Sequence, residues 1–171
     1  FVAVGEAVGG SGQVLTSADG MNWGLETTVI SAGLRALTVG NNALVAVGVG
    51  GVTARSADGT DWTSNPSGVS NELRGVTHAG GQYVAVGDNG RILTSPDGVT
   101  WTPRGSGTIA PLNVVAFLND RFLAAGDQGT VLTSANGVDW SRLEVPADAD
   151  LQAFGIAANG WFVLTGNRGV I

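Results

Sequence analysis

The residue types that most often carry chemistry are sparse in this sequence. His78 is the sole histidine, Tyr83 the sole tyrosine, and cysteine is absent. A lone histidine without a second histidine or a cysteine does not make an ordinary zinc site, and no nucleophile-elbow phrase supports a Ser-His-Asp triad. Tyr83 stands in an apolar run, so we expect it in the core. The sequence predicts no metal, no cofactor and no catalytic residue, and an enzyme is the less favoured interpretation.

A second group of residues is charged and recurs at matching positions. Glu6, Asp88 and Asp127 lie in glycine-flanked turns, and Arg35 and Arg74 share a position at the start of an apolar run. Asn113 and Gln152 follow at that position in later copies. We expect these side chains to share one face, which suits a cationic partner or a metal ion. The plainer alternative, which we favour, is that the acids begin turns and keep the protein soluble.

These positions are set by a repeat of 39 residues. A phrase Ser-x-Asp-Gly-x-x-Trp, with Asn replacing Asp in the last copy, occurs four times at this spacing. Its members are Ser17, Asp19 and Trp23; Ser56, Asp58 and Trp62; Ser95, Asp97 and Trp101; and Ser134, Asn136 and Trp140. A structural hairpin is the favoured interpretation, with the carboxylate accepting bonds from turn N–H groups. A ligand or Ca²⁺ site is the alternative. We expect the four indoles to pack inside the sheets.

Each repeat predicts four short strands separated by Asn-Gly or Asp-Gly turns. The second strand of each repeat is almost entirely apolar, as in Tyr83–Val86, and so needs cover on both faces. Four antiparallel strands in about 40 residues predict the blade of a β-propeller. The fold class is therefore all-β, with about four blades and a partial one, and we expect a segment of a larger propeller.

We expect one propeller segment over residues 1–171. Its repeats run over about 1–33, 34–72, 73–111, 112–150 and, as a partial copy, 151–171. Between blades the sequence predicts ten-residue connections. They add five acids to the charged face, namely Glu26, Glu72, Glu144, Asp148 and Asp150.

The repeated phrase resembles the Asp-box, or BNR repeat, of sialidase-like propellers, although it lacks the residue between Asp and Gly. The chain is also similar to bacterial WD40/YVTN/BNR-like proteins related to the photosystem II stability and assembly factor. The resemblance implies a propeller and a blade-corner role for the boxes. A sialidase site needs three converging arginines and a tyrosine nucleophile, and Tyr83 is expected in the core. Glycan binding or hydrolysis is therefore an alternative with little support from the residues.

Composition and charge narrow the classes of function and partner that remain. The formal net charge of −6, with eight arginines and no lysine, makes nucleic acid an unlikely partner. No apolar run approaches the length of a membrane-spanning helix. We expect a non-enzymatic binding or scaffolding module at a bacterial cell surface, secreted or periplasmic, that uses its inter-blade loops. Its partner would be a protein or a glycan, and a partner or further blades would complete the ring. An assembly factor for a membrane protein complex is a second alternative.

Overall fold

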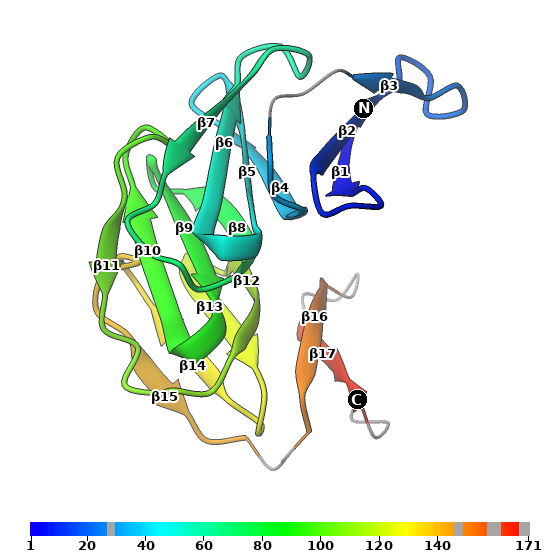
Figure 1. Ribbon diagram of the computed structural model, residues 1–171. Coiled ribbons are helices and arrows are strands. Elements are labelled where there is room, and N and C mark those ends of the chain that lie inside the picture. Colours follow the sequence, from blue (N-terminus) through cyan, green and yellow to red (C-terminus); the bar gives the residue numbers. More distant parts are fainter. Residues whose placement is uncertain (27–29, 146–148, 157–161, 168–171) are drawn as a thin grey trace.

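The computed structural model describes residues 1–26, 30–145, 149–156 and 162–167. Within these ranges the regular elements are β-strands and two short 3-10 turns, and five antiparallel sheets follow one another along an open arc (Figure 1). The predicted all-β fold of four-stranded blades is confirmed.

Strands pair in sequence order inside each sheet, so each sheet is a meander. The first sheet has three strands, β1 (Val2–Glu6), β2 (Gly12–Thr16) and β3 (Gly24–Glu26). The second has β4 (Leu34–Gly40), β5 (Ala43–Gly48), β6 (Val52–Ser56) and β7 (Trp62–Pro66), and the third has β8 (Leu73–Ala79), β9 (Gln82–Gly87), β10 (Arg91–Ser95) and β11 (Thr102–Arg104). The fourth has β12 (Leu112–Leu118), β13 (Arg121–Gly126), β14 (Val131–Ser134) and β15 (Ser141–Leu143), and the fifth has β16 (Leu151–Ile156) and β17 (Phe162–Gly166).

Neighbouring sheets meet through their first strands. Contacts run from β4 to β8, from β8 to β12 and from β12 to β16, so these strands form the inner side of the arc. The second strands lie between two neighbouring sheets, and Tyr83, Val84, Ala85 and Val86 of β9 are all fully buried. Burial on both faces explains why these strands are apolar throughout rather than alternating.

The phrase with the repeated tryptophan forms the turn between the third and fourth strands of each four-stranded sheet, and the turn between β2 and β3 in the first sheet; it is named here the Ser–Trp turn. Each turn packs against the preceding sheet. Trp62 joins a cluster with Val14 of β2, Trp101 one with Val45 of β5, and Trp140 packs against a cluster that contains Val84 of β9. The apolar contact between successive blades is therefore directional.

This direction corrects one expectation about the indoles. Trp62 and Trp101 are 7% and 9% exposed, but Trp23 is 44% exposed. Trp23 belongs to the first described sheet, so no preceding sheet covers its ring. The prediction that all four indoles lie inside the packing was wrong for Trp23.

The connections between blades are shorter than predicted. The fourth strands β7, β11 and β15 take up the first residues of the expected ten-residue loops, and β3 does the same in the first sheet. Glu26 is therefore part of β3, where its Oε1 accepts a 2.5 Å hydrogen bond from Thr16 Oγ1. It lies on the outermost strand rather than with the charged residues of the inner strands, which corrects its assignment to that face. Asp148 lies outside the described residues.

Candidate functional site

A close backbone contact holds the end of each second strand against the residue that precedes the first strand of the same blade. The amides of Val49, Asp88, Asp127 and Asn167 donate to the carbonyls of Gly33, Glu72, Pro111 and Asp150, at 2.9 to 3.1 Å. The residue before each amide is glycine, at positions 48, 87, 126 and 166, and a Cβ there would overlap the same carbonyl oxygen. Glycine is required because the two backbones approach too closely for any side chain.

This contact brings the first strand and the turn after the second strand together at one end of every blade. Arg74 Nε donates to Asp88 Oδ1 at 2.7 Å, and Asn113 Nδ2 donates to Asp127 Oδ1 at 2.7 Å. In both pairs the partners are 14 residues apart and occupy equivalent positions in consecutive blades. The structure therefore places Arg74, Asp88 and Asp127 on one surface, where the sequence put them.

Arg35 occupies the same position in the second sheet, but the residue 14 positions later is Val49. Arg35 instead binds two carboxylates from neighbouring segments: Nη1 lies 2.7 Å from Glu6 Oε2, and Nε lies 2.8 Å from Glu72 Oε1. The hydrogen bonds that Arg35 donates to Glu72 and, as the smaller cause, to Glu6 raise the pKa of its guanidinium above the ordinary value. Arg35 thus ties together the first sheet, the second sheet and the connection that leads into the third.

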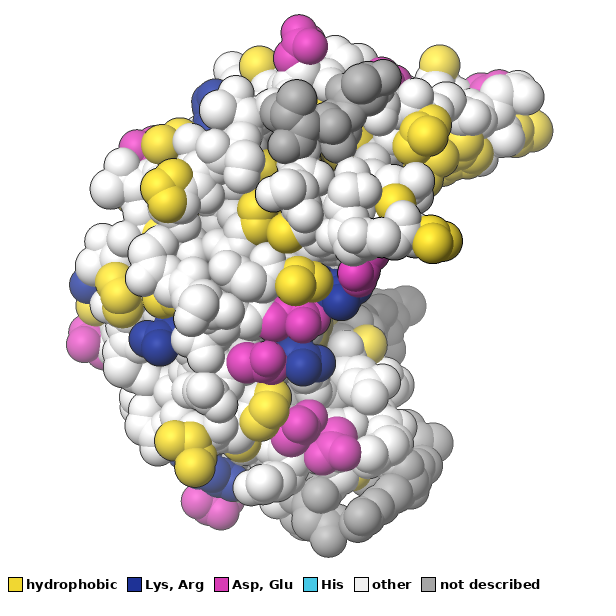
Figure 2. Space-filling model, viewed as in Figure 1, with side chains coloured by type: hydrophobic (Ala, Val, Ile, Leu, Met, Phe, Trp, Pro, Cys, Tyr) yellow, Lys and Arg dark blue, Asp and Glu magenta, His cyan; other side chains and the backbone are white. Residues whose placement is uncertain are grey.

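We name this surface the inner face. It consists of Glu6, Arg35, Glu72, Arg74, Asp88, Asn113, Asp127, Asp150, Gln152 and Asn167. A hollow of about 450 Å³ in it is lined by Arg35, Glu72, Arg74, Asn113 and Gln152. Figure 2 shows acidic and basic side chains gathered on the concave side of the arc. Five carboxylates and two guanidinium groups leave the face acidic, and both arginines are about two-fifths exposed in their side chains.

The carboxylates of the Ser–Trp turns are used inside the turns. Asp58 Oδ1 accepts from the amides of Thr60 and Asp61 at 2.9 and 3.0 Å, while Ser56 Oγ accepts from the amide of Gly59 at 2.8 Å. The two backbone bonds to Asp58 lower its pKa to about 2. Equivalent bonds in the other turns lower the pKa values of Asp19 and Asp97. Asn136 accepts the equivalent bonds at 2.9 Å from Val138 and Asp139. A neutral amide does the same work, so charge is not what the turn requires.

The two residues with potential for catalysis, Tyr83 and His78, pack against each other and against the protein interior. Tyr83 is fully buried and its hydroxyl donates to the carbonyl of Gly40. His78 packs against the ring of Tyr83 with centroids 4.6 Å apart. Across the described part of the chain, no three His, Cys, Asp or Glu side chains form a group suited to a metal ion.

One polar pair on the inner face was missed from the sequence. Asn167 Nδ2 donates to Asp150 Oδ2 at 2.6 Å, and the amide of Asp150 donates to Asn167 Oδ1 at 2.9 Å. Asn167 is the fifth-sheet counterpart of Asp88 and Asp127. From Gln152 in the first strand of this sheet to Asn167 is 15 residues, instead of the 14 that separate the equivalent pairs in the two preceding sheets. A strict 39-residue register therefore did not find Asn167.

Sheets of this topology, joined through their first strands around a common inner face, define a β-propeller. The chain belongs to the DUF6242 beta propeller domain family, whose model matches residues 29–154. No curated protein matches the chain in sequence. Among the described residues there is no helix with the length and apolar character needed to cross a membrane.

Solved structures agree with this fold. A structure of YCF48 bound to D1 peptide aligns with a TM-score of 0.71 at 17% identity, over 94% of this chain and 56% of that chain. YCF48 from Cyanidioschyzon merolae aligns at 0.61 and 16% identity, over 80% and 51%. The WD40 beta propeller domain of Doa1 aligns at 0.67 and 13% identity, over 98% and 58%. The chain therefore spans little more than half of each of these structures.

Proposed function

We propose that this chain is a non-enzymatic binding module whose inner face holds a polypeptide segment rich in lysine or arginine. The observation that carries the proposal is the surplus of carboxylates on that face. Arg35 and Arg74 are each paired with acids, and the hydrogen bonds that Asp127 and Asp150 accept from the described residues come from neutral groups. A cationic side chain would give these two carboxylates an ionic partner.

The geometry favours an extended ligand over a single ion. A pair of positions recurs along the arc, as Arg74 with Asp88 and then Asn113 with Asp127, and in the fifth sheet Asn167 binds the carboxylate of Asp150. A chain lying across several blades would meet one carboxylate per blade. One similar solved structure is that of YCF48 bound to D1 peptide, which supports a polypeptide as the partner class.

The proposal includes a holding or assembly role at an extracytoplasmic location, as the sequence predicts. A sialidase-like activity has no support in the site, because Tyr83 is fully buried and hydrogen-bonded to Gly40.

A matched pair of charge variants tests the site. Asp88→Asn with Asp127→Asn removes two charges from the inner face. Asp61→Asn with Asp120→Asn removes two at the opposite ends of the blades, in a Ser–Trp turn and in a turn between first and second strands. Asp120 has φ of 59°, a conformation that asparagine also adopts. The control thus matches the change in net charge.

The probe is a fluorescein-labelled twelve-residue peptide of Lys, Gly and Ser, with a Glu, Gly and Ser peptide as the negative control. Fluorescence polarisation at low ionic strength measures affinity. We expect the inner-face variant to bind the Lys peptide at least about fivefold more weakly and the control variant to match the parent, with binding weakened by salt. Equal losses in both variants would show a nonspecific charge effect and refute the proposal.

A further inference from the structure

A second polar hollow lies in the third blade and adjoins the inner face. It has a volume of about 640 Å³ and is formed by the turn between β9 and β10 and by the end of β11 with the connection that follows it. Arg91 and Arg104 line it, and Ile109 lies at its margin. We call it the third-blade hollow. Its residue Asn89 directly follows Asp88 of the inner face in the short turn η2 (Asp88–Gly90), so the two surfaces are neighbours.

The connection that walls this hollow is held by its own hydroxyl groups. Ser106 Oγ accepts from the amide of Thr108 at 3.3 Å and donates to the carbonyl of Thr108 at 3.1 Å, and Thr108 Oγ1 accepts from the amide of Ala110 at 3.0 Å. A Cβ added to Gly90 would lie 2.1 Å from the Thr108 carbonyl oxygen, so the connection is in close contact with the turn. A Cβ added to Gly105 would meet nothing within 4 Å. The hollow is therefore preformed, and it is open at Gly105.

The two arginines of the hollow have neutral partners within the described residues. Arg91 Nη2 donates to Asn71 Oδ1 at 3.2 Å, and Arg104 Nε donates to Thr94 Oγ1 at 2.9 Å. Arg91 Nε is buried and has no hydrogen-bond partner in the described part of the chain. The arginines of the inner face are bound to carboxylates instead. Because an unpaired buried donor costs free energy, an anion in the hollow would be stabilising.

The second blade has an equivalent hollow without these charges. That hollow also has a volume of about 640 Å³, and Val52 and Asn65 line it at the positions 39 residues before the two arginines. In the fourth blade the equivalent residues are Thr130 and Leu143. The repeat therefore supplies the shape of the hollow, and the third blade adds two guanidinium groups to it.

We propose that the third-blade hollow binds an oxyanion on the polypeptide partner, the carboxylate of an acidic residue or the phosphate of a phosphoserine. The inference rests on the proposed function, because the adjoining inner face holds the basic part of the same partner. Guanidinium groups bind both oxyanions through charge-assisted hydrogen bonds. Ile109 is 85% exposed and offers an apolar contact beside the charge. The partner therefore carries one acidic group next to its basic segment.

The test extends the Lys, Gly and Ser peptide of the inner face by a Gly-Ser-Gly spacer and one further residue. That residue is Glu, phosphoserine or Gln, placed at the amino end in one set of peptides and at the carboxyl end in the other. Added negative charge weakens nonspecific attraction to a chain of net charge −6. We expect the opposite at one of the two ends, where the Glu or the phosphoserine peptide binds at least about threefold more tightly than the Gln peptide in fluorescence polarisation. The tighter of the two identifies the oxyanion.

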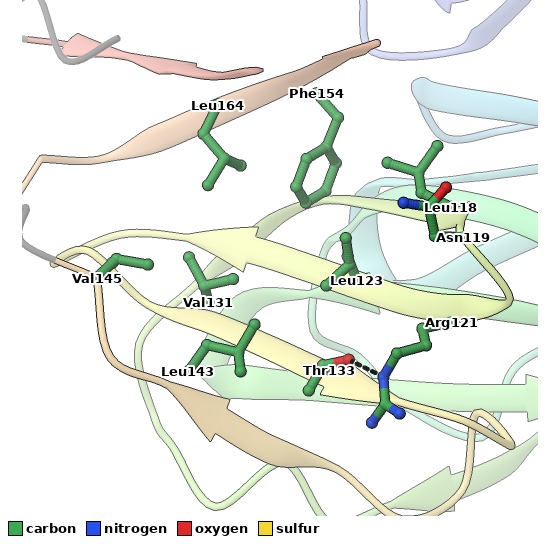
Figure 3. Close-up of a pocket in the computed structure, with 10 residues that line it drawn as sticks. All are labelled: Leu118, Asn119, Arg121, Leu123, Val131, Thr133, Leu143, Val145, Phe154 and Leu164. Atoms are coloured by element: carbon green, nitrogen blue, oxygen red, sulfur yellow. Dashed lines mark hydrogen bonds between the residues drawn. The ribbon is translucent and has the colours of Figure 1, made fainter. Parts of the chain in front are cut away.

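Two double variants of the chain locate the gain, and circular dichroism checks that both are folded. Arg91→Val with Arg104→Asn copies the hollow of the second blade. Arg121→Gln with Arg142→Gln removes the same charge from exposed positions outside the hollow, and it matches the loss of an arginine–threonine bond because Arg121 Nε donates to Thr133 Oγ1 at 3.0 Å (Figure 3). We expect the gain to vanish in the first variant and to persist in the second. No gain in the parent at either end, or the same gain in both variants, would overturn the inference.

A titration without lysine separates this inference from the proposed function. Glutamate and phosphoserine with blocked amino and carboxyl groups are titrated at millimolar concentration into ¹⁵N-labelled protein. We expect saturable amide shifts at Gly90, Arg91 and Gly105 in the parent that are lost in the Arg91→Val, Arg104→Asn variant. If the Gln peptides do not bind the parent, the inner-face proposal fails and these shifts alone decide the hollow. Absence of the shifts with both compounds would overturn the inference even where the Lys peptides bind.

Discussion

Replacing tryptophans one at a time tests whether each Ser–Trp turn packs on the blade before it. Trp62 and Trp23 have the same place in the repeat and differ in cover. Trp62 is 7% exposed and contacts the first sheet, whereas Trp23 is 44% exposed. Removing a buried tryptophan side chain costs about 3–5 kcal/mol, part of which comes from the cavity that surrounding atoms leave unfilled.

For Trp62→Ala the full cost applies, because the ring is 7% exposed and belongs to one apolar cluster with Val14 and Ala54. For Trp23→Ala the smaller buried area and the absence of a closed cavity reduce the expected loss to about 2 kcal/mol or less. The hydrogen bonds of the indoles do not contribute to the expected difference in stability between the two variants. Trp23 and Trp62 both donate to the glycine carbonyl of their own turn, at 3.1 and 2.9 Å.

The assay is urea unfolding monitored by far-UV circular dichroism. The dependence of the free energy of unfolding on urea concentration is compared between variants, because blades can unfold in separate steps. We expect Trp62→Ala to lower the free energy of unfolding by at least about 1 kcal/mol more than Trp23→Ala. Equal losses, or a larger loss for Trp23→Ala, would refute the directional packing of the turns.

Three further tests, which use four variants, rest on the same structure. Asp58 has its pKa lowered to about 2, so its stabilising bonds are complete above the ordinary value of 3.8 and are lost as the pH falls through 2; Asp58→Asn, which copies Asn136, should flatten the pH dependence of thermal stability between pH 5 and 2, and an unchanged profile would contradict this origin. Gly87→Ala brings a Cβ onto the Glu72 carbonyl and should lower the free energy of unfolding by about 1–3 kcal/mol, while Gly105→Ala, where nothing lies within 4 Å, should change it by less than about 0.5 kcal/mol in the same urea titration. Tyr83→Phe removes the hydroxyl that donates to Gly40 and should cost about 1 kcal/mol by calorimetry, whereas no loss would show that this buried bond adds nothing to stability.

Much of the fold could be predicted because it repeats. A tryptophan every 39 residues, with glycine turns at fixed offsets, indicated four-stranded blades, and the burial of Tyr83 followed from its apolar run. The direction in which the turns pack could not be predicted in this way, because a repeat gives the positions of equivalent residues but not which neighbour covers them. That direction explains why Trp23 is exposed.

The candidate site was predicted in part for a similar reason. Arg74 and Asp88 meet through a local relation of 14 residues that is visible in the sequence. Arg35 has valine at that offset, and its partners lie in the first sheet (Glu6) and in the connection to the third (Glu72). Such contacts depend on how blades are arranged, and the added residue in the fifth sheet hid Asn167 from a strict repeat.

Mapping the bound peptide by amide chemical shifts tests the central claim most directly, namely that the inner face is the binding surface. The Lys peptide is titrated into ¹⁵N-labelled protein at low ionic strength. The account predicts that the largest shifts fall at Arg35, Glu72, Asp88 and Asp127, which meet at one end of the blades. Shifts confined to the Ser–Trp turns at the opposite end, around Asp58 and Asp97, would contradict it.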